Sequence, residues 1–123
     1  MAKDMRVAYL LDFYGDLLTA KQRDSIELYY NDDLSLGEIA ADLGITRQGV
    51  RDNIKRAEAV LFEMEEKLGL AARFSDIKNG LAEIRRNIDI IDEKNMRIYR
   101  SNEINESIKV ILRELERLGQ LNE

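Results

Sequence analysis

The chain has 123 residues, a formal net charge of −5 and 35% charged residues, and it contains no Cys, His, Pro or Trp. The lack of Cys excludes disulfides and thiolate sites and fits a reducing cytoplasm, and the lack of His removes the commonest general base and metal ligand. No apolar run approaches the roughly 20 residues of a membrane span, and the N-terminus shows no signal-peptide core.

Few helix breakers interrupt the chain, which has 7 Gly and no Pro. Ile, Leu and charged residues are frequent, so the composition predicts an all-α protein. The length suits one domain with a helical extension. We place the division between residues 1–70 and residues 71–123.

The first predicted helix covers residues 4–17 and is apolar on nearly all sides. Its apolar residues form two stripes, which are Met5, Tyr9, Phe13 and Leu17 in one and Val7, Leu11, Tyr14 and Leu18 in the other. A helix of this kind is covered on both sides. We expect one stripe to pack on the following helices. The stripe that begins at Val7 is predicted to face the C-terminal helices or a second subunit.

Two capping boxes mark the starts of the next two helices. Thr19 and Gln22 form the first box, and Ser35 and Glu38 form the second. In each box the hydroxyl and the Gln or Glu side chain satisfy backbone N–H groups that would otherwise be unpaired. The predicted core residues of these helices are Ile26, Tyr29 and Tyr30 in one and Leu36, Ile39, Ala40 and Leu43 in the other.

A tight turn and a further helix complete a helix-turn-helix pattern. Gly44 suits the left-handed residue of the turn, and Thr46 can cap a helix that begins at Arg47. Ala40 is small where the two helices cross, and Val50 fills the angle between them. The pattern predicts a helix-turn-helix fold. The alternative is a helical hairpin used only for packing.

The helix from Arg47 to Leu68 would span roughly 33 Å. Its apolar residues follow a heptad spacing, at Val50, Ile54, Ala57, Leu61, Met64 and Leu68. The first turns can therefore face a groove while the rest is structural, and Asn53 is predicted to point outward. Gly69 would end the helix or lie in a bend.

The start of this helix is basic, with four cations on about three turns against a single Asp. This is typical of a helix that enters a nucleic-acid groove. Arg and Gln can make two-pronged contacts to base edges, and a Thr can touch a phosphate. The candidate nucleic-acid-binding residues are Thr46, Arg47, Gln48, Arg51, Lys55 and Arg56. The alternative for Arg56 is a structural ion pair with Asp52.

Two further apolar patterns occupy the C-terminal extension. One consists of Ile77, Leu81, Ile84, Ile88, Ile91, Asn95 and Ile98, and the other of Ile104, Ile108, Ile111, Leu115 and Leu118. Ser101 and Asn102 separate them. We predict a dimer through the first helix and these patterns, with Ile84, Ile88 and Ile91 at the interface and Asn95 fixing the register. The alternative is intramolecular, with the fifth helix folded back on the fourth.

Carboxylate pairs at helical spacing do not indicate catalysis. Asp12 with Asp16, and Glu63 with Glu66, are predicted to lie on solvated faces. A catalytic pair needs burial or a partner that separates the two pKa values, and a metal site needs more convergent ligands. No His can activate a Ser or Thr, and no Gly-rich phosphate loop is present. We expect no catalytic residue, no metal and no cofactor.

The chain from Thr19 to Leu61 resembles the region-4 DNA-binding domain of bacterial sigma factors. A closer resemblance, over Leu10 to Leu70, is to the YlxM-type family of small bacterial helix-turn-helix proteins associated with the signal recognition particle. The strings that carry it include Leu11-Asp12-Phe13-Tyr14, Asp33-Leu34-Ser35-Leu36, Thr46-Arg47-Gln48-Gly49-Val50 and Asp52-Asn53-Ile54-Lys55-Arg56. The chain departs from the family at Gly49, where Ala is common, and at Arg51.

This resemblance implies a cytoplasmic, dimeric, non-enzymatic regulator of the signal recognition particle pathway. Two hypotheses follow from it. In the first, the basic helix start binds nucleic acid, either promoter DNA or the RNA of the particle. In the second, the module is an adaptor that docks on the particle's GTPase or its receptor. Neither requires membrane insertion.

Overall fold

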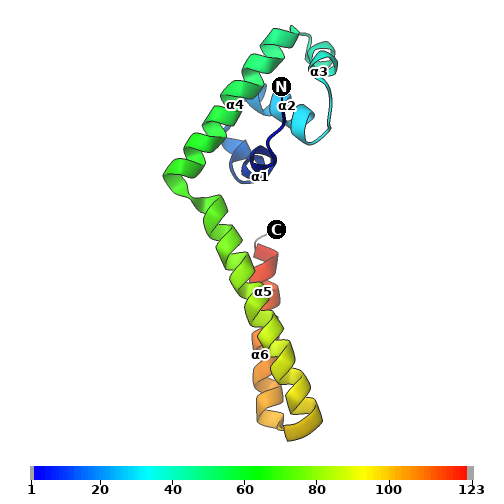
Figure 1. Ribbon diagram of the computed structural model, residues 1–123, viewed down its shortest axis with the longest axis vertical. Coiled ribbons are helices and arrows are strands. Elements are labelled where there is room, and N and C mark those ends of the chain that lie inside the picture. The colour runs from blue at the N-terminus through cyan, green and yellow to red at the C-terminus, as the bar shows by residue number, and fades with distance from the viewer. Residues whose placement is uncertain (1, 122–123) are drawn as a thin grey trace. The chain divides into compact units, whose positions relative to one another are not determined.

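The computed structural model describes residues 2–121, which form helices and connecting turns and contain no strand. The elements are α1 (Met5–Tyr14), the 3-10 turn η1 (Gly15–Leu17), α2 (Ala20–Tyr30), α3 (Leu36–Leu43), α4 (Arg47–Leu68), α5 (Leu70–Lys94), the π-helical turn η2 (Asn95–Tyr99) and α6 (Asn102–Leu121) (Figure 1). The predicted all-α fold is confirmed. The chain forms two compact units that divide between Ala71 and Ala72. That these units are independent domains stays a prediction.

Helix α1 begins at its predicted position but ends earlier than expected. The carboxylate of Asp4 caps it by accepting a hydrogen bond from the Arg6 backbone N–H at 3.0 Å. After Tyr14 the chain tightens into η1, which the Leu18 N–H closes by donating to the Gly15 carbonyl at 3.2 Å. This tighter turn brings the chain to Thr19, the cap of α2.

The stripe of α1 that begins at Val7 lies inside its own subunit. Val7, Leu11, Tyr14 and Leu18 are all buried, and they pack in one cluster with Ile26 of α2 and with Ala57 and Leu61 of α4. These four side chains are therefore not available to a second subunit, and the dimer interface predicted for them is corrected. The cause is that α2 and α4 together cover the face that the sequence left open. Met5, Tyr9 and Leu17, on the other stripe, are the exposed residues.

The second cluster of unit 1 joins α2, α3 and α4. Its buried residues are Tyr29, Ile39, Ala40, Val50 and Ile54. Both predicted capping boxes are present, at Thr19 with Gln22 and at Ser35 with Glu38. Gly44 has a φ of 68°, so it takes the left-handed conformation that was predicted for the turn. Together these features set the angle at which α4 leaves α3.

Unit 2 is a helical hairpin in which α6 runs back along α5 (Figure 1). Ile88 of α5 and Ile108 of α6 are buried in it. The partner of α5 within this unit is α6. Asn95 is buried too, and its partner is within the hairpin. Its side-chain amide donates to the Ser101 carbonyl at 3.0 Å and accepts from the Ser101 N–H at 2.9 Å, which closes the hairpin turn.

The hairpin leaves part of its apolar surface uncovered. Six Ile side chains are between 37% and 56% exposed, and they are Ile77, Ile84 and Ile91 on α5, Ile98 in η2, and Ile104 and Ile111 on α6. We call these six residues the isoleucine face. Towards the hairpin turn, an open groove runs between the helices and is lined mainly by Ile88, Ile91, Ile104, Ile108 and Ile111.

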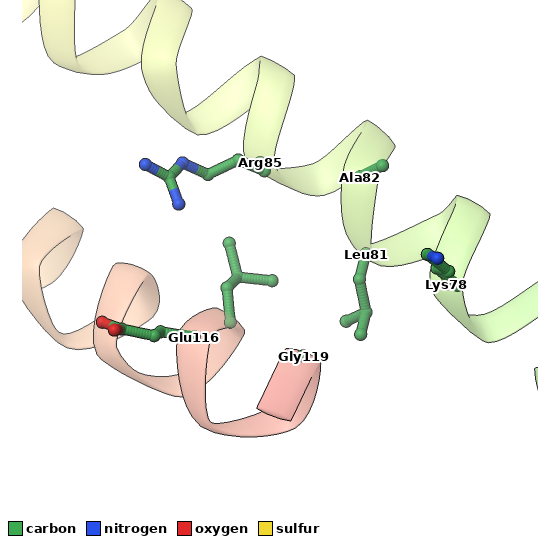
Figure 2. A pocket seen from close by; sticks show the side chains of 7 residues that line it. Lys78, Leu81, Ala82, Arg85, Glu116 and Gly119 are labelled. Atoms are coloured by element: carbon green, nitrogen blue, oxygen red, sulfur yellow. The ribbon is translucent and has the colours of Figure 1, made fainter. Parts of the chain in front are cut away.

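The open end of the hairpin is loosely packed. Figure 2 shows the Leu81 side chain of α5 pointing towards Gly119 of α6 across a pocket that Ala82, Arg85 and Glu116 also line. Apart from the backbone of α6 itself, no atom of residues 2–121 lies within 4 Å of the position that a Cβ would take at Gly119. Two helices alone therefore do not enclose a complete core here.

Candidate nucleic-acid interface

The six predicted nucleic-acid-binding residues lie together at the exposed start of α4. The buried stripe of this helix consists of Val50, Ile54, Ala57 and Leu61. Successive residues are about 100° apart around an α-helix, so the opposite face is centred on Gln48 and Asp52. Thr46, Arg47, Gln48, Arg51, Lys55 and Arg56 are all exposed. All six candidates are therefore accessible, and they spread over the outward half of the helix.

Thr46 begins this surface and also caps the helix. Its hydroxyl oxygen accepts a hydrogen bond from the Gly49 backbone N–H at 2.9 Å. This is the geometry expected of an N-cap residue, and the hydroxyl hydrogen remains available for donation. Thr46 can therefore hold the helix start and donate to a phosphate oxygen at the same time.

Of the nine basic residues of unit 1, four are in ion pairs with other described residues and five are not; one of the unpaired residues is Lys21, which is exposed on α2, and the other four lie together on α4. Lys3, Arg6, Arg23 and Lys67 each form an ion pair with a carboxylate. The cations at the start of α4, which are Arg47, Arg51, Lys55 and Arg56, make no ion pair within 4 Å of any residue in the described part of the chain. A cation outside an ion pair is available to an external anion, and Lys55 of these four also acts on a nearby carboxyl, that of Glu58.

The ion pair with Asp52, which was the alternative role for Arg56, is not formed. Asp52 instead accepts a hydrogen bond from the side-chain amide of Gln48, with 2.9 Å between Nε2 and Oδ1. Both pairings span four residues on one helix face, and Asp52 takes the earlier partner. Asp52 therefore does not hold Arg56 in an ion pair.

The side chain of Arg47 lies across the first turn of α3. A Cβ built on Gly37 would be 2.9 Å from Nη2 of Arg47, so the end of this flexible side chain comes close to the α3 backbone. The Arg47 guanidinium is thereby placed where α3 and α4 converge. Sequence reasoning missed Gly37, although a glycine inside the first turn of a short helix was a clue to a close approach.

Asn53 does not point outward as predicted. It is half-buried, and its amide nitrogen lies 3.4 Å from the hydroxyl oxygen of the buried Ser25 in α2. Asn53 lies on the flank of α4 that meets α2, and Ser25 offers it a polar partner inside the interface. It belongs to the packing of unit 1.

One acidic side chain modifies the charge of α4 beyond the candidate surface. Burial raises the pKa of the Glu58 carboxyl, and the positive charge of Lys55 partly opposes this shift. As the pH falls, Glu58 therefore takes up a proton before a fully solvated Glu does. The α4 surface then becomes more positive.

The carboxylate pairs lie on exposed surface, as predicted. Asp12 and Asp16 are exposed, and Asp16 pairs with Arg23 at 2.7 Å. Glu63 pairs with Lys67 at 2.9 Å, and Glu66 is exposed. Among residues 2–121 no three Asp or Glu side chains are placed to hold a metal ion. In the same range, no helix combines the length and the apolar character needed to cross a membrane.

Comparison with known proteins gives a family match over most of the chain. The family model described as "Putative helix-turn-helix protein, YlxM / p13 like" matches residues 1–104. The matched range contains the complete helix-turn-helix and all six candidate residues.

Bacterial relatives align over nearly the full length. A UPF0122 protein of Acetivibrio thermocellus is 47% identical over 123 residues, which is 100% of this chain and 99% of the relative. A UPF0122 protein of Thermoanaerobacter sp. (strain X514) is 51% identical over 110 residues, covering 89% of this chain and 91% of the relative. One of Bacillus cereus (strain AH187) is 43% identical over 118 residues, covering 96% and 98%.

Proposed function

The chain belongs to the family of YlxM- and p13-like helix-turn-helix proteins, and on that premise we propose that it is a non-enzymatic bacterial regulator that binds nucleic acid through the first turns of α4. The residues that would make the contacts are Thr46, Arg47, Gln48, Arg51, Lys55 and Arg56. Hydrolysis of a nucleotide by the purified chain alone would contradict the non-enzymatic part of this proposal.

The observation that carries the proposal is the group of four unpaired cations on an exposed, capped helix start. The whole chain has a net charge of −5, so it does not attract polyanions in general. A local cluster engages only a few phosphates, and we expect a modest affinity that falls with salt. The test is a titration of a fluorescent duplex. Binding that weakens between about 50 and 200 mM salt supports the proposal, and no binding at the lower salt contradicts it.

We further propose that the regulated process is the signal recognition particle pathway, in the bacterial cytoplasm. The support is the resemblance of the α1 and α4 strings to the YlxM-type family. The purified chain should then bind the RNA of the particle or its GTPase. If the chain binds no component of the particle, this part of the proposal is wrong. The proposed binding of nucleic acid by α4 would not be affected.

A second candidate function is that of an adaptor that docks on the particle's GTPase or its receptor without nucleic-acid contact. The observation that favours it is the isoleucine face, which exposes six Ile side chains. Capture experiments with and without nuclease separate the two functions. Nuclease-resistant capture of the GTPase, insensitive to salt, favours the adaptor.

We also propose that two copies associate through their isoleucine faces. Fully burying an Ile contributes about 1.5–3 kcal/mol, so each half-exposed Ile would contribute roughly 1 kcal/mol. Six such side chains per subunit are then enough to offset the entropy cost of association. Ile84 and Ile91 would lie in the interface, whereas Ile88 is already buried and would support it from beneath. The predicted contribution of α1 is not part of this proposal.

A further inference from the structure

The amide of Gln48 is held in one orientation on the outward face of α4. Its Nε2 atom donates one hydrogen to Oδ1 of Asp52 at 2.9 Å. Both side chains are exposed and lie opposite the buried stripe. A carboxylate accepts from the NH2 group and repels the amide oxygen, so Asp52 fixes which end of the amide is the donor. One N–H and the Oε1 oxygen of Gln48 remain free.

These two free groups match one base edge. In the major groove adenine presents an acceptor at N7 beside a donor at N6, and a Gln amide pairs with both by donating to N7 and accepting from N6. We infer that Gln48 reads the adenine of an A·T pair in duplex DNA, and that Asp52 is a positioning residue that orients its amide. The inference rests on the proposed nucleic-acid binding by α4.

The geometry of the helix favours DNA over duplex RNA. An α-helix with its side chains is about 10–12 Å wide, which fits the roughly 12 Å major groove of B-form DNA. The major groove of A-form RNA is deep and narrow, and side chains cannot read it. The surface of α4 fits the DNA arrangement. Gln48 and Asp52 occupy the centre of the outward face, and Arg51 and Arg56 flank them where the phosphates would lie.

The negative charge of Asp52 has an effect on binding that can be measured separately from its effect on Gln48. A carboxylate on this face repels the phosphates of every sequence and so lowers the general affinity. Its orientation of Gln48, in contrast, affects one base position only. Asp52→Ala should therefore raise the affinity for unselected duplexes while it weakens the preference for adenine. Asp52→Asn should restore that preference, because its amide oxygen still accepts the hydrogen bond.

The experiment is selection of binding sites by the full chain from random duplex DNA, followed by titration of the selected duplex. The wild-type chain should select a site with adenine at one position. Replacement of that base should weaken binding by a factor between about 5 and 150, the range that a bidentate base contact provides. Substitution with 7-deazaadenine, which lacks the N7 acceptor, should cause a loss of the same order. Gln48→Ala should abolish the preference at this position alone, and Gln120→Ala, an exposed Gln of α6, should not.

The outcomes distinguish this inference from the proposed function. No binding to any duplex would contradict both. Binding without an enriched adenine, or an enriched adenine that Gln48→Ala still selects, would overturn the inference and leave the proposed function intact. Equal affinity for RNA and DNA duplexes would overturn the assignment of DNA. If Asp52→Ala raises affinity and leaves the base preference unchanged, Asp52 has no positioning role.

Discussion

Tyr14 of α1 donates a hydrogen bond from its phenolic hydroxyl to Oε1 of Glu65 in α4, at 2.7 Å. The same two side chains accept from the first backbone N–H groups of α5, since Leu70 donates to the Tyr14 hydroxyl at 3.2 Å and Ala71 donates to Glu65 at 3.0 Å. The first N–H groups of a helix have no partner within that helix. Tyr14 and Glu65 therefore cap the start of α5 directly after the left-handed Gly69.

Replacing Tyr14 with Phe should destabilise unit 1. The substitution removes the hydroxyl that donates to Glu65 and accepts from Leu70, while the ring remains. A buried hydrogen bond contributes about 1 kcal/mol, and an unsatisfied buried group adds to the loss, so we expect a decrease of about 1–3 kcal/mol in the free energy of unfolding. Urea denaturation measures it. Tyr99→Phe is the matched control, because Tyr99 is 70% exposed, and it should leave the stability unchanged. Equal effects of the two substitutions would refute the capping role.

The ionisation of Tyr14 gives an alkaline limit to stability. Burial first, and then the hydrogen bond to Glu65, raise the pKa of Tyr14 above its ordinary value. A group with a raised pKa in the folded state holds its proton more tightly there. Its contribution to stability is full below about pH 10, where a free Tyr begins to ionise, and is lost as the pH rises through the folded pKa. Between neutral pH and about pH 11, the free energy of unfolding should fall less steeply with pH for Tyr14→Phe than for the wild-type chain. Burial also raises the pKa of Tyr30, so part of the decline should remain. Parallel curves for the two proteins would be the contrary result.

Two glycines should respond to alanine in opposite directions. Gly44 has a φ of 68° between α3 and α4, where a Cβ costs about 1–2 kcal/mol. Gly80 lies inside α5, and beyond the backbone of that helix no atom of the described residues is within 4 Å of the position of a Cβ, so alanine should stabilise the helix by about 0.5–1 kcal/mol. Thermal unfolding followed by circular dichroism should show a lower midpoint for Gly44→Ala and no decrease for Gly80→Ala. A stabilised Gly44→Ala chain would refute the role given to this turn.

The helix-turn-helix could be predicted from sequence because its determinants are local. Helices α3 and α4 begin and end where the sequence placed them, since Ser35, Gly44 and Thr46 each act on backbone groups within four residues. Such contacts do not depend on the rest of the fold. The spacing of the apolar residues in α4 also predicted that its cations would be exposed.

Other features depend on choices that spacing does not decide. Asp52 lies four residues from both Gln48 and Arg56, and only the structure selects Gln48. The cover of the Val7 stripe depends on how α2 and α4 pack around α1, and that is tertiary information. The π-helical turn η2 also escaped prediction, because Asn95 looked like a register residue of a coiled coil and instead closes the hairpin on Ser101.

Self-association should depend on the isoleucine face and not on α1. Ile91→Glu introduces a charge at a side chain that is 48% exposed, and light scattering at micromolar concentration should show a shift from dimer to monomer with the helical signal unchanged. Ile90→Glu is the control, since Ile90 is 45% exposed but lies off this face, and it should leave the mass unaltered. Leu11→Glu should unfold unit 1 instead, because Leu11 is buried in its core. A wild-type mass near the 14.2 kDa of one chain across a tenfold dilution would contradict the dimer.

The central claim, that α4 binds nucleic acid through its unpaired cations, is tested most directly by the salt dependence of duplex binding for Arg47→Ala/Arg51→Ala. Both residues are exposed, so the circular-dichroism signal of the helices should not change. Each lost phosphate contact lowers the slope of log affinity against log salt by about one unit, so we expect weaker binding and a slope lower by about two. Arg85→Ala/Arg86→Ala removes the same charge from α5, where both side chains are in ion pairs, and should retain the wild-type slope. Wild-type affinity and slope in the Arg47 and Arg51 double variant would contradict the account.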